Sequence, residues 1–156
     1  MTRLPEVIIN GPRPFAPRVS AFTRPFWDGL RDRRLMSTRC ADCGAISFPP
    51  RSLCRACWGR RIEWIELSAT GRLYSFTRVH VVPRAFAADA PYAIGIVDID
   101  DGPRLMCRLM TEVDQSDLDA PVGMLVLRYD DGYLFGARLL EARRAARAAG
   151  GTEESR

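Results

Sequence analysis

Four of the five cysteines lie close together in the stretch CADCGAISFPPRSLCRAC, as two Cys-x-x-Cys pairs separated by ten residues. Each Cys-x-x-Cys turn presents two thiolates to one point, and two turns complete the tetrahedral all-thiolate site that usually holds structural Zn²⁺. Because four protein ligands leave no open position for water or substrate, we expect this zinc to fold a small segment rather than to catalyse a reaction. The predicted ligands are Cys40, Cys43, Cys54 and Cys57.

Other uses of clustered cysteines fit this stretch less well, with iron in a rubredoxin-like site as the second candidate. A disulfide framework requires an oxidising compartment, and a thioredoxin-like motif uses one Cys-x-x-Cys at the start of a helix. Gly44 follows the first pair, where a metal-binding turn needs a positive φ so that backbone N–H groups can face sulfur. Pro49 and Pro50 break the connecting segment into a turn.

The sequence contains no convincing catalytic set. Cys107 stands alone in the run LMCRL, and a catalytic thiolate would need a nearby base, for which His80 is the only histidine. We expect Cys107 to be a small buried apolar residue. His80 with Asp98 or Asp100 could form an acid/base pair, but a histidine among valines in a strand is more often structural. We therefore expect a protein that is not itself an enzyme.

Basic charge is concentrated in the first part of the chain, and all 23 basic side chains are arginines. Residues 1–68 have 12 Arg and 6 acidic residues (+6), residues 69–142 have 7 Arg and 11 acidic residues (−4), and residues 143–156 have 4 Arg and 2 acidic residues (+2). A basic front half favours an anionic partner, namely nucleic acid, a nucleotide-like cofactor or an acidic protein face. The alternative is an arginine surface that is merely solvated.

The chain of 156 residues suits one ordinary domain or two very small ones. No apolar run approaches the roughly 18–20 residues that a membrane helix needs. The N-terminal stretch has Arg3 but neither an unbroken apolar region nor a small-residue cleavage site, so we expect no signal peptide. These features predict a cytoplasmic protein.

A short helix is expected just before the cysteines. Residues 1–22 are rich in proline and predict an extended N-terminal arm, after which Thr23 can cap a helix over Arg24–Met36. An apolar stripe on this helix is a candidate surface for a partner protein, or else it packs on the cysteine segment. The stripe consists of Phe26, Trp27 and Leu30.

A small β-barrel is expected after the cysteines. Turn signals such as Asp101-Gly102 and Asp130-Asp131-Gly132 separate a series of short strands. We predict a leading strand over Ile62–Leu67 and then five strands, a number that suits an OB-fold. The five are Arg72–Val82, Pro91–Asp100, Arg104–Val113, Gly123–Tyr129 and Tyr133–Leu140. The predicted divisions are residues 23–66 for helix and ribbon, 67–142 for the barrel and 143–156 for an Arg/Ala-rich tail.

This order of helix, four-cysteine ribbon and five-stranded barrel resembles a known family, the rubredoxin-like zinc-ribbon/OB-fold proteins associated with acyl-CoA metabolism. The resemblance covers residues 22–140 and departs from the family at YLFG, where members often have a Pro-rich stretch around a Phe. The matching segments are FW and GL at 26–30, CADCG, FPPR at 48–51, CRAC, Gly71, PYAIGIVDID at 91–100 and VGMLV at 122–126.

The resemblance implies a mainly β fold with a structural zinc and a supporting role in metabolism. Proteins of this family act as non-catalytic subunits that stabilise thiolase-like enzymes, ketoacyl-CoA synthases, MaoC-like hydratases or aldolases. They also help to hold the acyl-CoA substrate. The resemblance therefore implies a hetero-oligomer with one of these enzymes.

CoA is a plausible ligand because its phosphates are anionic and Arg guanidinium groups bind phosphate oxygens in pairs. Trp58 or Trp64 could stack on adenine, and Phe86 could contact an acyl chain or a partner. Each of these residues could instead cover or solvate its own domain. The candidate phosphate ligands are Arg51, Arg55, Arg60 and Arg61.

A single-stranded nucleic acid is the alternative ligand, because OB-folds bind single strands with a basic groove and exposed aromatic rings. The charge of −4 on residues 69–142 argues against it. Five aspartates at strand ends and turns would repel a phosphate backbone there: Asp98, Asp100, Asp101, Asp130 and Asp131.

Overall fold

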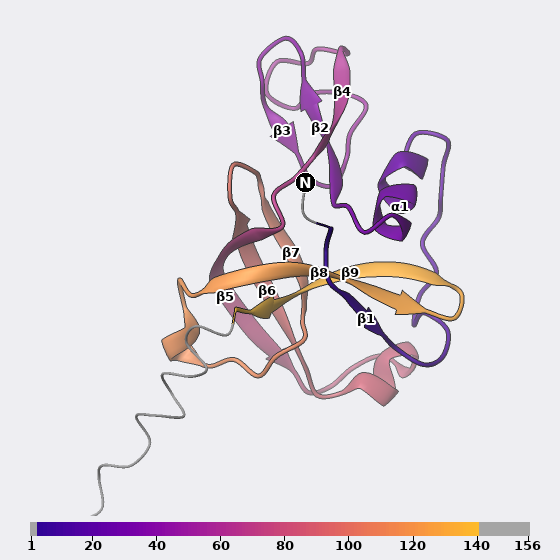
Figure 1. Ribbon diagram of the computed structural model, residues 1–156, viewed down its shortest axis with the longest axis vertical. Coiled ribbons are helices and arrows are strands. Elements are labelled where there is room, and N and C mark those ends of the chain that lie inside the picture. Colours follow the sequence, from indigo (N-terminus) through magenta and orange to yellow (C-terminus); the bar gives the residue numbers. More distant parts are fainter. Residues whose placement is uncertain (1–2, 141–156) are drawn as a thin grey trace, which may run out of the picture.

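The computed structural model describes residues 3–140 and shows a mainly β protein (Figure 1). A small sheet of three strands holds the cysteines, and a larger sheet closes into a barrel below it. This architecture confirms the predicted fold class. None of the helices in the described part of the chain has the length and apolar character needed to cross a membrane. The tail predicted for residues 143–156 lies outside the described residues.

The small sheet is built around strand β2 (Met36–Cys40). This strand pairs antiparallel with β3 (Ile46–Ser47) on one side and β4 (Ile62–Glu66) on the other. β2 ends at the first metal-ligand candidate, Cys40, so the sheet holds one end of the cysteine cluster. The sequence predicts β4 and a turn at Pro49 and Pro50 between short strands, of which β3 is the first, but it does not predict β2.

The barrel closes because β8 pairs with both β5 and β9, while β9 also pairs in parallel with β7. The five predicted strands are therefore confirmed, with shifted ends. Alternate residues of the second strand are buried, as expected for a strand with one face on the core. The strands are β5 (Thr70–Val79), β6 (Tyr92–Ile99), β7 (Arg104–Leu109), β8 (Pro121–Tyr129) and β9 (Gly132–Leu139).

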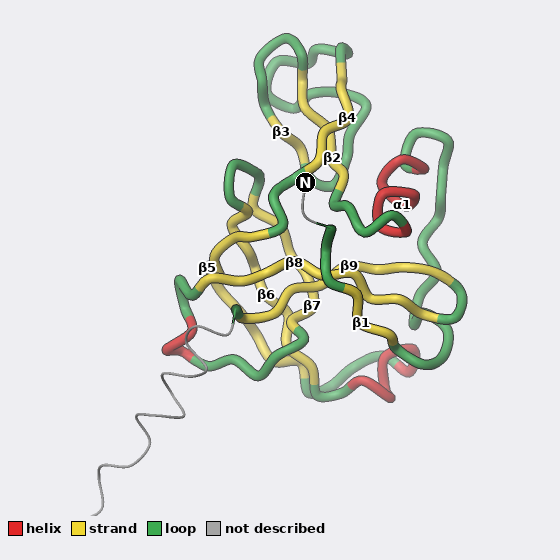
Figure 2. The backbone as a smooth tube through the Cα atoms, viewed as in Figure 1, coloured by secondary structure: helices red, strands yellow, loops and turns green. Residues whose placement is uncertain are grey.

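Two short 3₁₀ helices connect strands of the barrel. η1 (Arg84–Asp89) joins β5 to β6 and lies at the end of the barrel away from the ribbon (Figure 2). η2 (Gln115–Asp117) joins β7 to β8. The tight turns are as predicted, since Asp101 has a φ of 56° and Gly132 a φ of 150°.

The N-terminal arm is not separate from the barrel. Its strand β1 (Glu6–Ile8) pairs in parallel with β8, and Arg13 binds the β8–β9 turn. The Arg13 N–H and its Nε both donate to Asp131, at 2.8 and 3.2 Å. The arm is thus extended, as predicted, but it pairs with a strand more than a hundred residues away in sequence. Local sequence patterns do not indicate such a pairing.

The helix is shorter than the sequence predicts. α1 (Arg24–Arg31) ends before Arg33, which has a φ of 61°, and Met36 already belongs to β2. Thr23 is the N-cap residue of the helix, as predicted, but its hydroxyl pairs with Ser20 and makes no capping hydrogen bond to the helix.

The apolar stripe of α1 joins the ribbon to the barrel. The ring of Phe26 lies 6.0 Å from the rings of both Phe48 and Phe135, which come from the ribbon and from β9. Phe26 and Leu30 are buried, so the partner-binding interpretation does not hold for these two residues. Their apolar surface is already used within the chain. Trp27 is half-buried beside Phe26.

Candidate metal centre

The two Cys-x-x-Cys turns have the same backbone design. In the first, the N–H of Gly44 donates to the Cys40 carbonyl at 2.9 Å. In the second, the N–H of Trp58 donates to the Cys54 carbonyl at 3.1 Å. Trp58 therefore occupies in the second turn the position that glycine occupies in the first.

This position requires the left-handed region in both turns. Gly44 has the predicted positive φ, at 76°, and Trp58 has a φ of 61°. This region is unfavourable by roughly 1–2 kcal/mol for a residue with a side chain, whereas glycine has no such penalty. Gly59, next to Trp58, serves a different purpose, because a Cβ there would collide with the carboxylate of Asp42.

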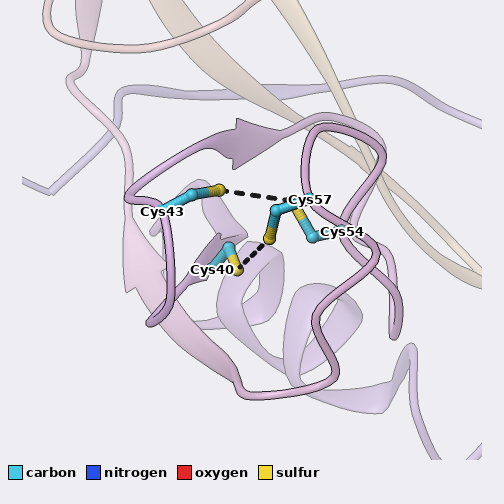
Figure 3. A group of neighbouring side chains, drawn as sticks. All are labelled: Cys40, Cys43, Cys54 and Cys57. Atoms are coloured by element: carbon cyan, nitrogen blue, oxygen red, sulfur yellow. Dashed lines mark hydrogen bonds between the residues drawn. The ribbon is translucent and has the colours of Figure 1, made fainter.

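The four sulfur atoms converge on one point (Figure 3). The Sγ atoms of Cys40 and Cys57 are 3.6 Å apart, as are those of Cys43 and Cys54, and all four lie within 4.8 Å of one another. Sulfur atoms placed tetrahedrally at the usual Zn–S distance of about 2.3 Å are roughly 3.8 Å apart. The cluster therefore fits one zinc ion with four thiolate ligands.

Close packing of the four thiols shifts their pKa values in opposite directions. The backbone N–H groups of Cys57 and Ala56 lower the pKa of Cys54 to about 7. The N–H of Gly59 favours the Cys57 thiolate, but the neighbouring thiols, Cys43 first, outweigh it and raise the pKa of Cys57 to about 12. Four thiolates cannot occupy one small site without a positive charge among them.

An ion pair lies beside the cluster. Nε of Arg61 donates to Oδ1 of Asp42 at 2.6 Å, and Oδ2 of Asp42 lies 4.0 Å from Sγ of Cys40. Arg61 thus braces the first cysteine turn. Of the four arginines predicted to bind phosphate, it is the one with a partner inside the ribbon.

The other three candidate arginines are free on the surface. Arg51, Arg55 and Arg60 are exposed, and none of them lies within salt-bridge distance of a carboxylate in residues 3–140. Trp58, which lies between Arg55 and Arg60 in the sequence, is 73% exposed. The second cysteine turn therefore presents an unpaired basic surface with one aromatic ring.

The arginines of the barrel are mostly paired. Nε of Arg104 donates to Asp98 at 2.6 Å, Nη2 of Arg78 to Glu112 at 2.6 Å, and Nη1 of Arg108 to Asp89 at 2.8 Å. Such pairs leave little positive potential on the barrel for a polyanion. The remaining pairs are Arg72 with Asp119 and Arg128 with Glu6.

Two of the three aromatic candidates outside the helix are partly buried. The ring of Phe86 in η1 lies 6.3 Å from that of Tyr92, so it folds back onto the barrel end. Trp64 in β4 is half-buried, with its ring 5.5 Å from that of Phe22. Of the two tryptophans considered for stacking on adenine, Trp58 is the one whose ring is largely exposed to solvent.

Cys107 and His80 do not form a pair. Cys107 is 6% exposed, and burial raises the pKa of its thiol to about 12, which confirms the predicted apolar role. His80 is exposed, just after β5 ends. Residues 3–140 contain no hydrogen bond between the two.

Two family models match consecutive parts of the chain. The ChsH2 rubredoxin-like zinc ribbon domain matches residues 27–63, and the ChsH2 C-terminal OB-fold domain matches residues 64–129. The first match and the sulfur geometry together identify the cysteine cluster as a structural zinc site.

Two proteins with similar sequences are named as a scaffold protein and as an enzyme subunit. A DUF35 domain-containing scaffold protein of Methanocaldococcus jannaschii is 35% identical over 64% of this chain and 70% of its own length. The benzoylsuccinyl-CoA thiolase subunit BbsA of Thauera aromatica is 35% identical over 48% of this chain and 51% of its own length. The chain therefore matches only about half of the thiolase subunit.

A solved structure described as the Ltp2-ChsH2(DUF35) aldolase has the same fold. It superposes with a TM-score of 0.68 at 26% identity and covers 80% of this chain and 98% of that chain.

Proposed function

The chain belongs to the DUF35 family, with its ChsH2-type zinc ribbon and OB-fold, and from this premise we propose that it is a non-catalytic subunit of an acyl-CoA-processing enzyme. In this role it binds and stabilises a thiolase-like enzyme in the cytoplasm and helps to hold the acyl-CoA substrate. An aldolase or a MaoC-like hydratase is the other kind of partner.

The main support for the proposal is the similarity of this chain to proteins that are named as subunits of acyl-CoA enzymes. Relatives are named as a scaffold protein and as a thiolase subunit, and a neighbouring structure is named as an aldolase assembly. The site chemistry agrees with it. A zinc with four protein ligands has no open coordination position at which a reaction could occur.

We propose the exposed face of the second cysteine turn as the site that meets the anionic part of CoA. Arg51, Arg55 and Arg60 have no carboxylate partner in the described residues, so they are free to bind phosphate oxygens. Trp58 next to them offers a ring for adenine. We assign Arg61 to bracing Asp42 rather than to CoA.

Single-stranded nucleic acid is a weaker candidate ligand. An OB-fold that binds a single strand needs a basic groove along the barrel. Here Arg72, Arg78, Arg104, Arg108 and Arg128 are each paired with a carboxylate.

Co-expression with the enzymes encoded next to this protein tests the proposal. The tagged chain is purified with each neighbour and analysed by size exclusion, mass spectrometry and metal determination. We expect a stoichiometric complex with an acyl-CoA enzyme and one zinc per chain. A monomer that binds none of these enzymes, and retains nucleic acid through a salt wash, would overturn the proposal in favour of the nucleic-acid alternative.

A further inference from the structure

A cavity of about 260 Å³ lies on the barrel beside η1. Its wall comes from η1, β6, β7, β8, β9 and Pro14 of the N-terminal arm, so it includes the strand face and the loop at which OB-folds bind ligands. Its wall is mostly apolar, with rings from Phe86, Tyr92 and Tyr129 and aliphatic groups from Ile94 and Leu127. One charged residue, Arg108, also lines it.

Arg108 brings spare hydrogen-bond donors to this apolar wall. Its Nη1 donates to Oδ2 of Asp89 at 2.8 Å, and its guanidinium carbon lies 5.3 Å from the centre of the Tyr92 ring. Its Nε is buried and has no acceptor in residues 3–140. An unsatisfied buried donor is unfavourable by about 1–3 kcal/mol. Such a group gains from an added oxygen acceptor, which a ligand supplies when it enters beside the Tyr129 side chain that already interacts with Arg108.

The charges that line the cavity determine whether a ligand can offer a charged or an uncharged oxygen to Arg108. Asp89 neutralises Arg108, and both side chains are only about a quarter exposed, at 23% and 24%. A ligand carboxylate would have to lie close to the Asp89 carboxylate, and like charges repel strongly where water is scarce. The pair therefore favours an uncharged acceptor such as a ketone, ester or thioester oxygen.

The size of the cavity limits the ligand. Pockets that enclose a whole drug-sized ligand measure roughly 300–1,000 Å³, so this one suits a small molecule or the end of a longer one. Met106, which lines the cavity and is largely exposed, extends the apolar surface at its mouth.

We propose that this cavity is a second ligand site, separate from the basic ribbon surface, which binds an aliphatic molecule or chain with one uncharged oxygen acceptor. Arg108 donates to that oxygen, and the rings of Phe86 and Tyr92 pack on the aliphatic part. Asp89 holds Arg108 in place and excludes carboxylates.

A titration with matched probes tests this site. The zinc-loaded full chain is titrated with octan-2-one and with octanoate while the NMR shifts of the cavity residues are followed. We expect octan-2-one to bind three- to tenfold more tightly, the range that one hydrogen bond supplies. Arg108→Met should lower the affinity for octan-2-one by a similar factor. Arg104→Met is the control, because it removes a paired arginine that does not line the cavity.

Asp89→Asn gives the sharper result. Without the carboxylate, Arg108 keeps its full charge, so the preference should reverse and octanoate should bind more tightly than octan-2-one. Octanoyl-CoA, used as a third probe, separates an acyl thioester from a free neutral molecule as the source of the ligand. The proposal is overturned if neither short probe shifts the cavity residues, or if ketone and carboxylate bind equally in every variant.

Discussion

The ribbon and the barrel of this protein are held together by different means. In residues 36–66 the buried side chains are two cysteines and two hydroxyl residues: Cys40, Cys54, Ser37 and Thr38. The barrel instead buries a continuous set of Leu, Val and Met side chains, among them Leu73, Val97 and Met124. Full burial of each such side chain contributes about 1.5–3 kcal/mol. The barrel therefore has a core that can fold it, and the ribbon depends on its metal.

The two regions also differ in how their charges are used. Arginines of the barrel lie in ion pairs that cross between strands or close a loop, as Arg104 does with Asp98. The ribbon leaves Arg51, Arg55 and Arg60 unpaired among the described residues. We infer that the ribbon, which has few fully buried side chains of its own, presents the recognition surface, and that the barrel supplies the stable body behind it.

Removing the metal should separate the two regions most clearly. Zinc binding supplies about 10–16 kcal/mol in modules of this size, so chelation or Cys54→Ser should unfold the ribbon and leave the barrel folded. Limited proteolysis with mass spectrometry measures this. We expect rapid cleavage within residues 36–66 and protection of the strands of the barrel. Cys107→Ser is the matched control, because this buried cysteine lies outside the four-cysteine cluster. Loss of the whole fold on chelation would contradict the comparison.

The junction between the regions should be the next most sensitive place. Phe26→Ala removes a ring that contacts both Phe48 of the ribbon and Phe135 of the barrel. We expect a loss of about 3–5 kcal/mol in the free energy of unfolding, measured by urea denaturation of the zinc-loaded chain. Phe15→Ala, at an exposed phenylalanine, should have little effect. A small loss for Phe26→Ala would show that this ring does not hold the ribbon against the barrel.

A substitution of Trp58 should distinguish stability from recognition. Glycine accepts a φ of 61° without the penalty of an L-residue, and Trp58 is largely exposed. Trp58→Gly should therefore leave the zinc-loaded ribbon as stable as before or up to about 1 kcal/mol more stable, while acyl-CoA binding weakens. Ribbon stability is followed by urea denaturation, and binding by calorimetry. A clear loss of stability would instead assign Trp58 a packing role.

Breaking a surface ion pair of the barrel should have the smallest effect. A hydrogen bond from Arg104 lowers the pKa of Asp98 below its ordinary 3.8. The contribution of this ion pair to stability is therefore present above pH values near the ordinary pKa of Asp98. It is lost as the pH falls through the lowered pKa of Asp98 in the folded chain. Asp98→Asn should destabilise the chain slightly at neutral pH, and the difference should vanish in acid. Thermal unfolding of the wild-type and Asp98→Asn chains at several pH values measures this. A stability difference between them that grows in acid would contradict a stabilising Asp98–Arg104 ion pair.

Local patterns made the zinc ligands and most barrel strands predictable. The cysteine spacing fixes the ligand set because each turn is closed by neighbouring residues, and Asp101-Gly102 marks its hairpin for the same reason. The strand pairing of the arm with β8 and the Arg108–Asp89 pair were not predictable, because they join residues that only the folded chain brings together. The helix end at Arg33 was missed for a related reason. The stretch to Met36 suits a helix, but the β2–β4 pairing takes Met36 into the sheet.

The central claim is that this chain supports the chemistry of another enzyme. The most direct measurement is the turnover of acyl-CoA by the partner enzyme alone, by this chain alone and by the reconstituted complex. We expect no turnover by this chain alone, weak or short-lived activity of the partner alone, and a gain in the activity or lifetime of the partner in the complex. Turnover by this chain alone, or a partner that performs equally well without it, would contradict the account.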